Sequence, residues 1–234
     1  ASGAESLLAA TAESEENPLL SPDEHAVVYT TGQSVWLVEV ESGVPRRLCT
    51  GCGTPISLHP DSRRILLRSG AVRRRAIHML DVASPEGSIG WLADPQYSFR
   101  HAAISPDSNW IAVTAESVAD AVAYLWLVPM EAGRPAARSR WIPAAGADPE
   151  SALQWDRQSR RLYFFSSRDG SRCLWSLGWD RHGPGPLEEI RHWSGSRIRP
   201  WNSWLSIGGG RAVFELTDAT SNIFLIEPSA GPSL

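Results

Sequence analysis

Long apolar runs are missing from this sequence of 234 residues. No stretch approaches the roughly 20 apolar residues that a membrane-spanning helix needs, so we expect no membrane insertion by this segment. The first residues, ASGAESLLAATAESEEN, show neither the basic start nor the apolar core of a signal peptide. The compartment is therefore unknown from the sequence, with a leaning toward an extracytoplasmic domain.

Signatures of catalysis are also lacking. The sequence has no Gly-x-Ser-x-Gly elbow, no Walker A loop, no Gly-x-Gly-x-x-Gly and no His-Glu-x-x-His. No pair of carboxylates has a spacing that demands acid–base chemistry. We therefore predict no catalytic residues, no cofactor and no metal.

Lysine is absent, and all 22 basic residues are arginine, which we attribute to codon usage. The net charge of −4 argues against nucleic acid as a partner. The charge is uneven: residues 1–60 hold eight acidic residues and two arginines, whereas residues 151–211 hold five acidic residues and ten arginines. This asymmetry indicates either two differently solvated faces or a basic patch for an acidic partner.

Cysteine is scarce, with three residues. Cys49 and Cys52 form a Cys-x-x-Cys pair, but a zinc ribbon needs a second such pair, and only Cys173 is left. Pro55 after the pair favours a strand over the helix of a thioredoxin-like site. The alternatives are a local disulfide or two packed thiols at Cys49 and Cys52, a disulfide involving Cys173, or metal or redox chemistry.

What the sequence does contain is an internal repeat, a polar turn followed by an apolar run. Its anchors lie at positions 20, 58, 104, 155 and 205, so the spacings are 38, 46, 51 and 50 residues. Propeller blades recur at about 40–50 residues. Proline fixes φ at a turn position and aspartate bonds its own backbone, so the repeat predicts a tight turn between two strands. The copies read LSPDEHAVVY, LHPDSRRILL, ISPDSNWIAV, WDRQSRRLYF and LSIGGGRAVF.

A second apolar segment follows each copy, and a weaker third segment follows four of them. These segments are short, rich in Val, Ile, Leu and Trp, and bounded by turn residues, which indicates strands. The pattern predicts an all-β fold, a single β-propeller domain over residues 1–234 with five blades of four antiparallel strands. We expect a strand within residues 1–12 to complete the last blade and remove an exposed edge; the alternative is a six-bladed ring. The repeats are expected at about 15–50, 54–93, 98–145, 150–194 and 197–228.

Tryptophan is abundant, with 11 residues. Large flat side chains can fill the space that widens outward between blades, so we expect packing rather than ligand stacking. The tryptophans that fall in or beside the expected third and fourth strands are Trp36, Trp126, Trp175, Trp91, Trp141 and Trp193.

The stretch SPDSNWIAVTAE followed by YLWLVP resembles the TolB-like propeller repeat, a relative of the WD40-like repeat. CTGCGTPISLHPDSRRILL and RLYFFSSRDGSRCLW resemble propellers of acidobacterial proteins, which stand alone or are fused to serine/threonine kinases or winged-helix regulators. The resemblance implies a sensor or scaffold role, as in a domain of a larger signalling protein. Two copies depart from the pattern: Trp155-Asp156-Arg157 replaces Ser-Pro-Asp, and the fifth copy lacks the motif.

In a propeller, the loops around the mouth of the central channel are the usual binding surface. We predict a non-catalytic module for protein–protein interaction or ligand sensing, whose partner is another protein or peptide. Arg73, Arg74 and Arg75 form either a solvated turn or a contact patch for an acidic partner. The alternatives are a small-molecule or glycan-binding propeller and, less favoured, a hydrolase or lyase with its site in the channel. The predicted binding residues are Asn17, Thr54, Arg74, Arg100, His101, Ser151, Arg168, Arg199 and Trp201.

Overall fold

The computed structural model describes residues 14–144, 149, 153–170, 172–180, 183–193, 199–208, 211–217 and 222–226. Nearly all of the regular structure in these residues is β-strand. The chain divides into two compact units, residues 1–99 and residues 100–234. Among the described residues, no helix has the length and apolar character that crossing a membrane requires.

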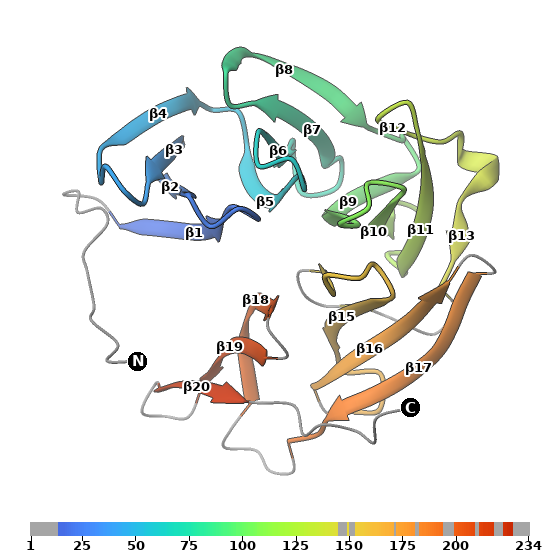
Figure 1. Ribbon diagram of the computed structural model, residues 1–234. Helices are drawn as coiled ribbons and strands as arrows, with labels where there is room; N and C mark the ends of the chain where they lie inside the picture. The colour runs from blue at the N-terminus through green and yellow to red at the C-terminus, as the bar shows by residue number, and fades with distance from the viewer. Residues whose placement is uncertain are drawn as a thin grey trace. The chain divides into compact units, whose positions relative to one another are not determined.

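The first unit contains two four-stranded antiparallel sheets in which consecutive strands are neighbours (Figure 1). The first sheet consists of β1 (Glu15–Leu20), β2 (Ala26–Thr31), β3 (Ser34–Glu39) and β4 (Pro45–Thr50). The second consists of β5 (Thr54–Leu58), β6 (Arg64–Ser69), β7 (Ala76–Asp81) and β8 (Ser84–Leu92).

The second unit contains three more sheets. The first is built from β9 (Tyr97–Ile104, which starts just before the boundary), β10 (Trp110–Ser117), β11 (Ala123–Glu131), β12 (Arg134–Pro135) and β13 (Ile142–Pro143), with a 3-10 turn at Arg138–Arg140. The next has β14 (Gln154–Trp155), β15 (Arg161–Ser166), β16 (Cys173–Asp180) and β17 (Gly183–Arg191). The last has β18 (Arg199–Gly208), β19 (Arg211–Thr217) and β20 (Asn222–Ile226).

The described chain therefore holds four complete blade-like sheets and a fifth sheet of three strands. Of the five expected blades with four strands each, the described residues thus show four, and the last sheet has three strands. The last repeat carries only three strand-forming segments, so its own sequence cannot supply a fourth. The strand expected within residues 1–12 lies outside the described residues.

The Ser-Pro-Asp turns after β1 and β9 share one hydrogen-bond pattern. The serine hydroxyl donates to the aspartate at 2.6 Å and accepts the amide of the residue that opens the next strand at 2.9 or 3.0 Å. The aspartate also accepts a backbone amide two residues further on, at 3.1 Å in both turns. The polar motif thus closes the turn with its own side chains, as the repeat predicts. The residues involved are Ser21, Asp23, His25 and Ala26, and Ser105, Asp107, Asn109 and Trp110.

The turn that begins with Trp155-Asp156-Arg157 keeps the backbone hydrogen bonds of these turns, although its side-chain bond spans four residues and not two. Asp156 Oδ1 accepts the Arg160 amide at 2.7 Å, and Ser159 has a φ of 57°, close to the 58° of Ser108 in the turn after β9. Trp155 adds a link of its own, because its Nε1 donates to the Ala103 carbonyl at 3.0 Å. The different sequence of this repeat therefore adds a contact with the neighbouring sheet and still forms the turn.

Each unit has a core between its adjacent sheets. In the first unit, Val28, Val35 and Leu37 of the first sheet pack with Ile65 and Leu80 of the second. In the second unit, the larger cluster joins the sheet of β9–β13 to that of β14–β17. It comprises Ala103, Ala112, Leu125, Leu127, Ala144, Leu153, Trp155, Leu162, Phe164, Cys173, Trp175, Leu177 and Trp179.

The tryptophans of the third strands are less uniformly buried than expected. Trp175 belongs to the core and is 7% exposed, whereas Trp36 and Trp126 are half-buried. Strand alternation explains the difference for β11, where Leu125 and Leu127 take the core face and Trp126 takes the other. Trp175 therefore packs against a neighbouring sheet, whereas Trp126 packs against residues of its own repeat.

Candidate functional site

Two of the predicted binding residues in the first unit contribute to its strands. Asn17 lies within β1 at a register shift, has a φ of 55°, and donates from Nδ2 to Thr30 Oγ1 at 3.0 Å. The Thr30 hydroxyl in turn donates to the Glu16 carbonyl at 3.0 Å. Thr54 is the first residue of β5 and is half-buried. Asn17 therefore has an observed structural role, which is to hold the irregular pairing of β1 with β2.

Arg74 lies in the loop of residues 70–75, between β6 and β7, and this loop is firmly held. Its Arg74 amide donates to the Ala71 carbonyl at 2.8 Å. Ser98 Oγ donates to the Val72 carbonyl at 2.7 Å and accepts the Arg75 amide at 3.3 Å. Backbone and side-chain bonds thus fix the loop from both sides.

Gly70 allows this loop to turn so tightly. Its φ is +96°, and a Cβ placed there would lie 2.6 Å from the Arg74 carbonyl oxygen. Any other residue would meet both a strained backbone and a steric clash. The glycine therefore contributes directly to the shape in which the arginines are presented.

The side chains at the tip of the loop are exposed to solvent. Val72 is 70% exposed, and Arg73 and Arg74 are exposed as well. Neither guanidinium has a hydrogen bond or ion pair within the described part of the chain. An ordered loop thus presents one aliphatic side chain and two uncompensated positive charges.

In the second unit, Arg100 and His101 are neighbours on β9 and therefore point to opposite faces of the sheet. Arg100 forms an ion pair with Glu116 of β10. The His101 amide donates to Thr114 Oγ1 at 3.0 Å. The structure does not direct these two predicted residues into one site.

Arg168 lies in the turn between β15 and β16. Its guanidinium stands over the Trp175 ring at 5.1 Å and lies 3.6 Å from Asp169. Among the other predicted residues, Ser151 lies outside the described residues. Arg199 and Trp201 are in β18, in a part of the strand where only the backbone is described.

Cys49 and Cys52 form a disulfide, with their Cα atoms 6.0 Å apart. Both pack against the core of the first unit. Cys173 is a free thiol and is fully buried. Of the alternatives that the sequence leaves open, the structure contains the local disulfide.

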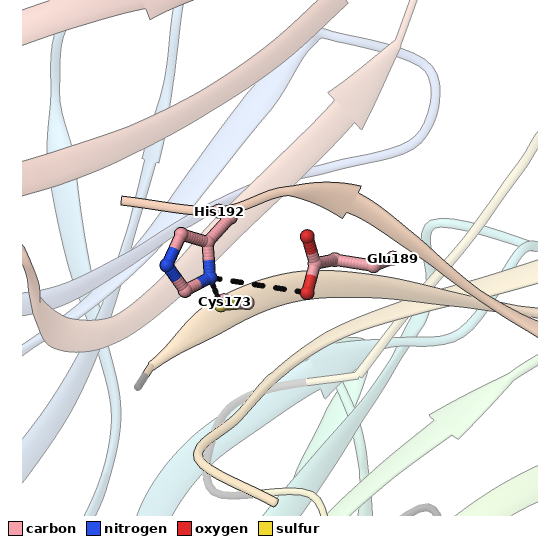
Figure 2. Close-up of side chains that lie close together, drawn as sticks. All are labelled: Cys173, Glu189 and His192. Atoms are coloured by element: carbon pink, nitrogen blue, oxygen red, sulfur yellow. Dashed lines mark hydrogen bonds and ion pairs between the residues drawn. The ribbon is translucent and has the colours of Figure 1, made fainter. Parts of the chain in front are cut away.

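Cys173 meets Glu189 of β17 and His192, the residue just after that strand, and sequence reasoning did not connect either with it (Figure 2). Cys173 Sγ lies 3.0 Å from His192 Nδ1, and that nitrogen lies 3.9 Å from Glu189 Oε2. The side chains of His192 and Glu189 are 44% and 37% exposed. A buried sulfur, an imidazole and a carboxylate therefore converge at a point that is open to solvent on one side.

The surroundings of Cys173 disfavour a reactive thiolate. Burial raises the pKa of the Cys173 thiol above its ordinary value, and the Glu189 carboxylate raises it further. A thiol with a raised pKa is protonated at neutral pH and is a poor nucleophile. The raised pKa of Cys173 therefore argues against covalent catalysis by this thiol.

The strand register explains why these residues meet. Leu174 pairs with Arg191, so Cys173 and His192 are the next opposed positions. Trp175 pairs with Glu189, which leaves Ile190 as an extra residue on β17. Such a bulge shifts the alternation of side chains, so that Glu189 and His192 share a face. The sequence indicates the hairpin of β16 and β17, but it does not show where in the hairpin the bulge lies.

An open groove of about 670 Å³ lies between the sheet of β9–β13 and that of β14–β17. Two tryptophans shape it: Trp110 and Trp179 are in edge-to-face contact, with ring centroids 4.5 Å apart. The groove thus combines aromatic faces with hydrogen-bonding groups. Its polar lining residues are Asp107, Asn109, Ser159, Arg160 and Asp180.

The chain is similar in structure to several solved proteins. It matches TolB from Acinetobacter baumannii with a TM-score of 0.62 and 12% identity, over 93% of this chain and 55% of that one. It matches a protein described as TolB from Agrobacterium tumefaciens with a TM-score of 0.67 and 18% identity, over 91% of this chain and 73% of that one. A gluconolactonase from Xanthomonas campestris matches with a TM-score of 0.64 and 15% identity, over 96% and 79% of the two chains.

These likenesses, together with the repeated antiparallel sheets, define the protein as all-β and propeller-like, with TolB-like neighbours. At such low identities they bear on the fold alone. No protein-family model matches the chain, and no curated protein matches it. The chain spans 55% of the length of the Acinetobacter TolB.

Proposed function

We propose that the chain is a non-catalytic propeller module that binds another protein or peptide through the loop of residues 70–75. The observation that carries the proposal is the ordered presentation of Val72, Arg73 and Arg74 to solvent. The partner segment would be acidic, to pair with the two guanidinium groups, and would carry an aliphatic side chain to cover Val72.

Preorganisation supports this proposal. A loop that is already ordered loses little conformational entropy when a partner binds, so more of the contact energy appears as affinity. Arginine also suits carboxylate partners, because its planar guanidinium can bind both oxygens of one carboxylate. A solvated turn would need neither the Ser98 bonds nor the tight turn at Gly70 to keep its arginines in water.

The structural neighbours fit this proposal without requiring it. The TolB-like propellers are consistent with an interaction module, and the gluconolactonase is an enzyme of similar fold. We propose the first role for this chain because its ordered loop of residues 70–75 presents an apolar side chain and two arginines to solvent. A sensor or scaffold domain of a larger signalling protein is the setting that we propose.

The same proposal includes one closed domain over residues 1–234, in which residues 1–12 add a fourth strand to the sheet of β18–β20. Closure would remove an unpaired strand edge, which is otherwise prone to aggregation. Deleting residues 1–12 should then lower the melting temperature or yield aggregated protein. A deletion protein that stays monomeric with an unchanged melting temperature would refute closure.

Peptide titration tests the binding surface. A fluorescein-labelled peptide of glutamates flanking a single leucine is titrated with the full chain at low salt, and binding is followed by anisotropy. The Arg73→Glu/Arg74→Glu variant should bind at least about tenfold more weakly, because two attractive charges become repulsive. Binding to the original protein should also weaken with added salt.

A matched control separates the loop from net charge. Arg47→Glu/Arg63→Glu changes two other exposed arginines of the same unit by the same total charge. This control should keep the affinity of the original protein. Equal weakening in both double variants, or none in either, would count against residues 70–75 as the binding surface.

The groove at Trp110 and Trp179 favours a second candidate function, the binding of a glycan or another small molecule. Aromatic faces beside carboxylate, amide and guanidinium groups suit a polar ligand with an apolar face. A titration with N-acetylglucosamine oligomers, followed by tryptophan fluorescence, tests this candidate. Saturable quenching that is lost in Trp110→Ala would support it, and unchanged fluorescence would remove it for this class of sugar.

A further inference from the structure

The hairpin of β16 and β17 brings three different metal-ligating groups together. Cys173 and Trp175 lie on the face of β16 that packs into the core. Across from them lie Glu189 of β17 and His192, which directly follows that strand. The three ligand atoms, one sulfur, one nitrogen and one oxygen, all lie within 4.8 Å of one another. Figure 2 shows the His192 ring between Cys173 and the Glu189 carboxylate, with one ring nitrogen facing both.

This set of atoms suits zinc. Thiolate sulfur, imidazole nitrogen and carboxylate oxygen are the usual protein ligands of Zn²⁺, and their mixture fits this ion better than calcium or magnesium, which prefer oxygen alone. Zinc bonds of about 2.0–2.3 Å in a tetrahedron place neighbouring ligand atoms about 3.3–3.6 Å apart. The observed separations of 3.0 Å from Sγ to Nδ1 and 3.9 Å from Nδ1 to Oε2 lie on either side of that range.

Small side-chain rotations are sufficient to reach the tetrahedral distances. His192 and Glu189 are partly exposed, so their torsions can adjust without disturbing the core. Cys173 is fixed by its burial and would serve as the anchor of the site. The exposed side of the cluster gives an ion a path from solvent and leaves room for a fourth ligand.

We propose that Cys173, Glu189 and His192 form a three-ligand zinc site, with the fourth coordination position open to water or to a small anionic ligand. On binding, the Cys173 thiol releases its proton to solvent and the sulfur bonds to the metal as a thiolate. The ion would then join β16 to the end of β17, where the bulge at Ile190 interrupts regular pairing.

A simple hydrogen bond between the thiol and the imidazole is the competing explanation of the contact. That explanation needs no metal, and Glu189 contributes only a further hydrogen bond and its charge. A zinc site needs all three side chains. The two explanations therefore make different predictions for a change at Glu189.

Cobalt titration provides the test, because Co²⁺ replaces zinc in such sites and reports a thiolate ligand by its charge-transfer absorption. The full chain is stripped with a chelator, kept without reductant so that the Cys49–Cys52 disulfide persists, and titrated with Co²⁺ and then with Zn²⁺. We expect a charge-transfer band that saturates at one equivalent and is abolished by zinc. Cys173→Ser should remove the band.

Variants of the two exposed ligands test the zinc site even if Cys173→Ser does not fold. His192→Gln should weaken the metal affinity by more than the about 10–100-fold typical of residues that only support a ligand, and Glu189→Gln should weaken it at least about tenfold. Cys49→Ser/Cys52→Ser and His78→Gln are the controls and should keep the band and the affinity. A missing band in the original protein, or unchanged affinity in either ligand variant, would overturn the proposal.

Discussion

The backbone amide of Asp107, in the turn after β9, donates a hydrogen bond of 3.1 Å to the hydroxyl of Ser159, in the turn after β14. The first unit has the same link, where the Asp23 amide donates to Ser62 Oγ at 3.2 Å. In each case the aspartate of one repeat bonds the left-handed serine of the next repeat. The repeated turn therefore does two things: it closes its own hairpin and it ties that hairpin to the neighbouring sheet.

Replacing Ser159 by alanine tests this tie. Ser159 is only 8% exposed, so its loss leaves the Asp107 amide without its acceptor. We expect Ser159→Ala to lower the free energy of unfolding by about 1 kcal/mol, measured by urea denaturation. Ser139→Ala, at an exposed position of the 3-10 turn, is the control, and an equal loss in both variants would contradict the role of Ser159.

The two faces of β11 should differ in their contribution to stability. Leu127 is fully buried, and Leu127→Ala should cost about 2–5 kcal/mol. Trp126 is half-buried, with the Arg138 guanidinium 3.9 Å from its ring centre. Trp126→Ala should cost about 2 kcal/mol, less than the roughly 3–5 kcal/mol of a fully buried tryptophan. Thermal and urea unfolding measure both, and a greater loss at Trp126 would reverse the assignment of the faces.

The Cys49–Cys52 disulfide should contribute modestly to stability because it closes a very short loop. The chain-entropy relation gives about 2 kcal/mol for a loop of about four residues. We expect Cys49→Ser/Cys52→Ser to lose no more than this in chemical denaturation, with the fold retained. If the double variant cannot fold, the disulfide is needed for more than loop closure.

Acid should weaken the turn at Asp107 in a predictable direction. Burial alone would raise the pKa of Asp107, but hydrogen bonds from Ser105 and Asn109 outweigh it and hold the pKa below the ordinary value of 3.8. A carboxyl whose pKa is lower in the folded state stabilises the fold fully above its unfolded-state pKa. That stabilisation is lost as the pH falls through the folded-state pKa.

Asp107→Asn removes this titrating group while keeping the shape of the side chain. The free energy of unfolding of the original protein should fall as the pH is lowered past the ordinary aspartate pKa of 3.8, and the variant should show a shallower fall. Urea denaturation at a series of pH values measures both slopes. Parallel curves for the two proteins would show that Asp107 contributes nothing to the acid sensitivity.

Part of the candidate site could be predicted from the sequence. The arginines of residues 73–75 stand out as a charged turn between two apolar segments, and the structure places them in a loop between β6 and β7. Their ordering depends on Ser98, which lies 26 residues beyond Val72 and comes from the start of another strand. No local pattern could indicate that contact.

Turn chemistry and strand alternation were determined by the sequence alone, because both act over a few residues. Ser21 and Asp23 form their turn with their own side chains, and this local chemistry recurs often enough to predict a repeat of antiparallel sheets. Cys173 and His192 are 19 residues apart, and their contact of 3.0 Å depends on the register of β16 with β17. That register includes an extra residue at Ile190, which places Glu189 and His192 on one face. The pairing of the strands in the folded chain, which no local pattern specifies, therefore brought together the three side chains of the proposed zinc site.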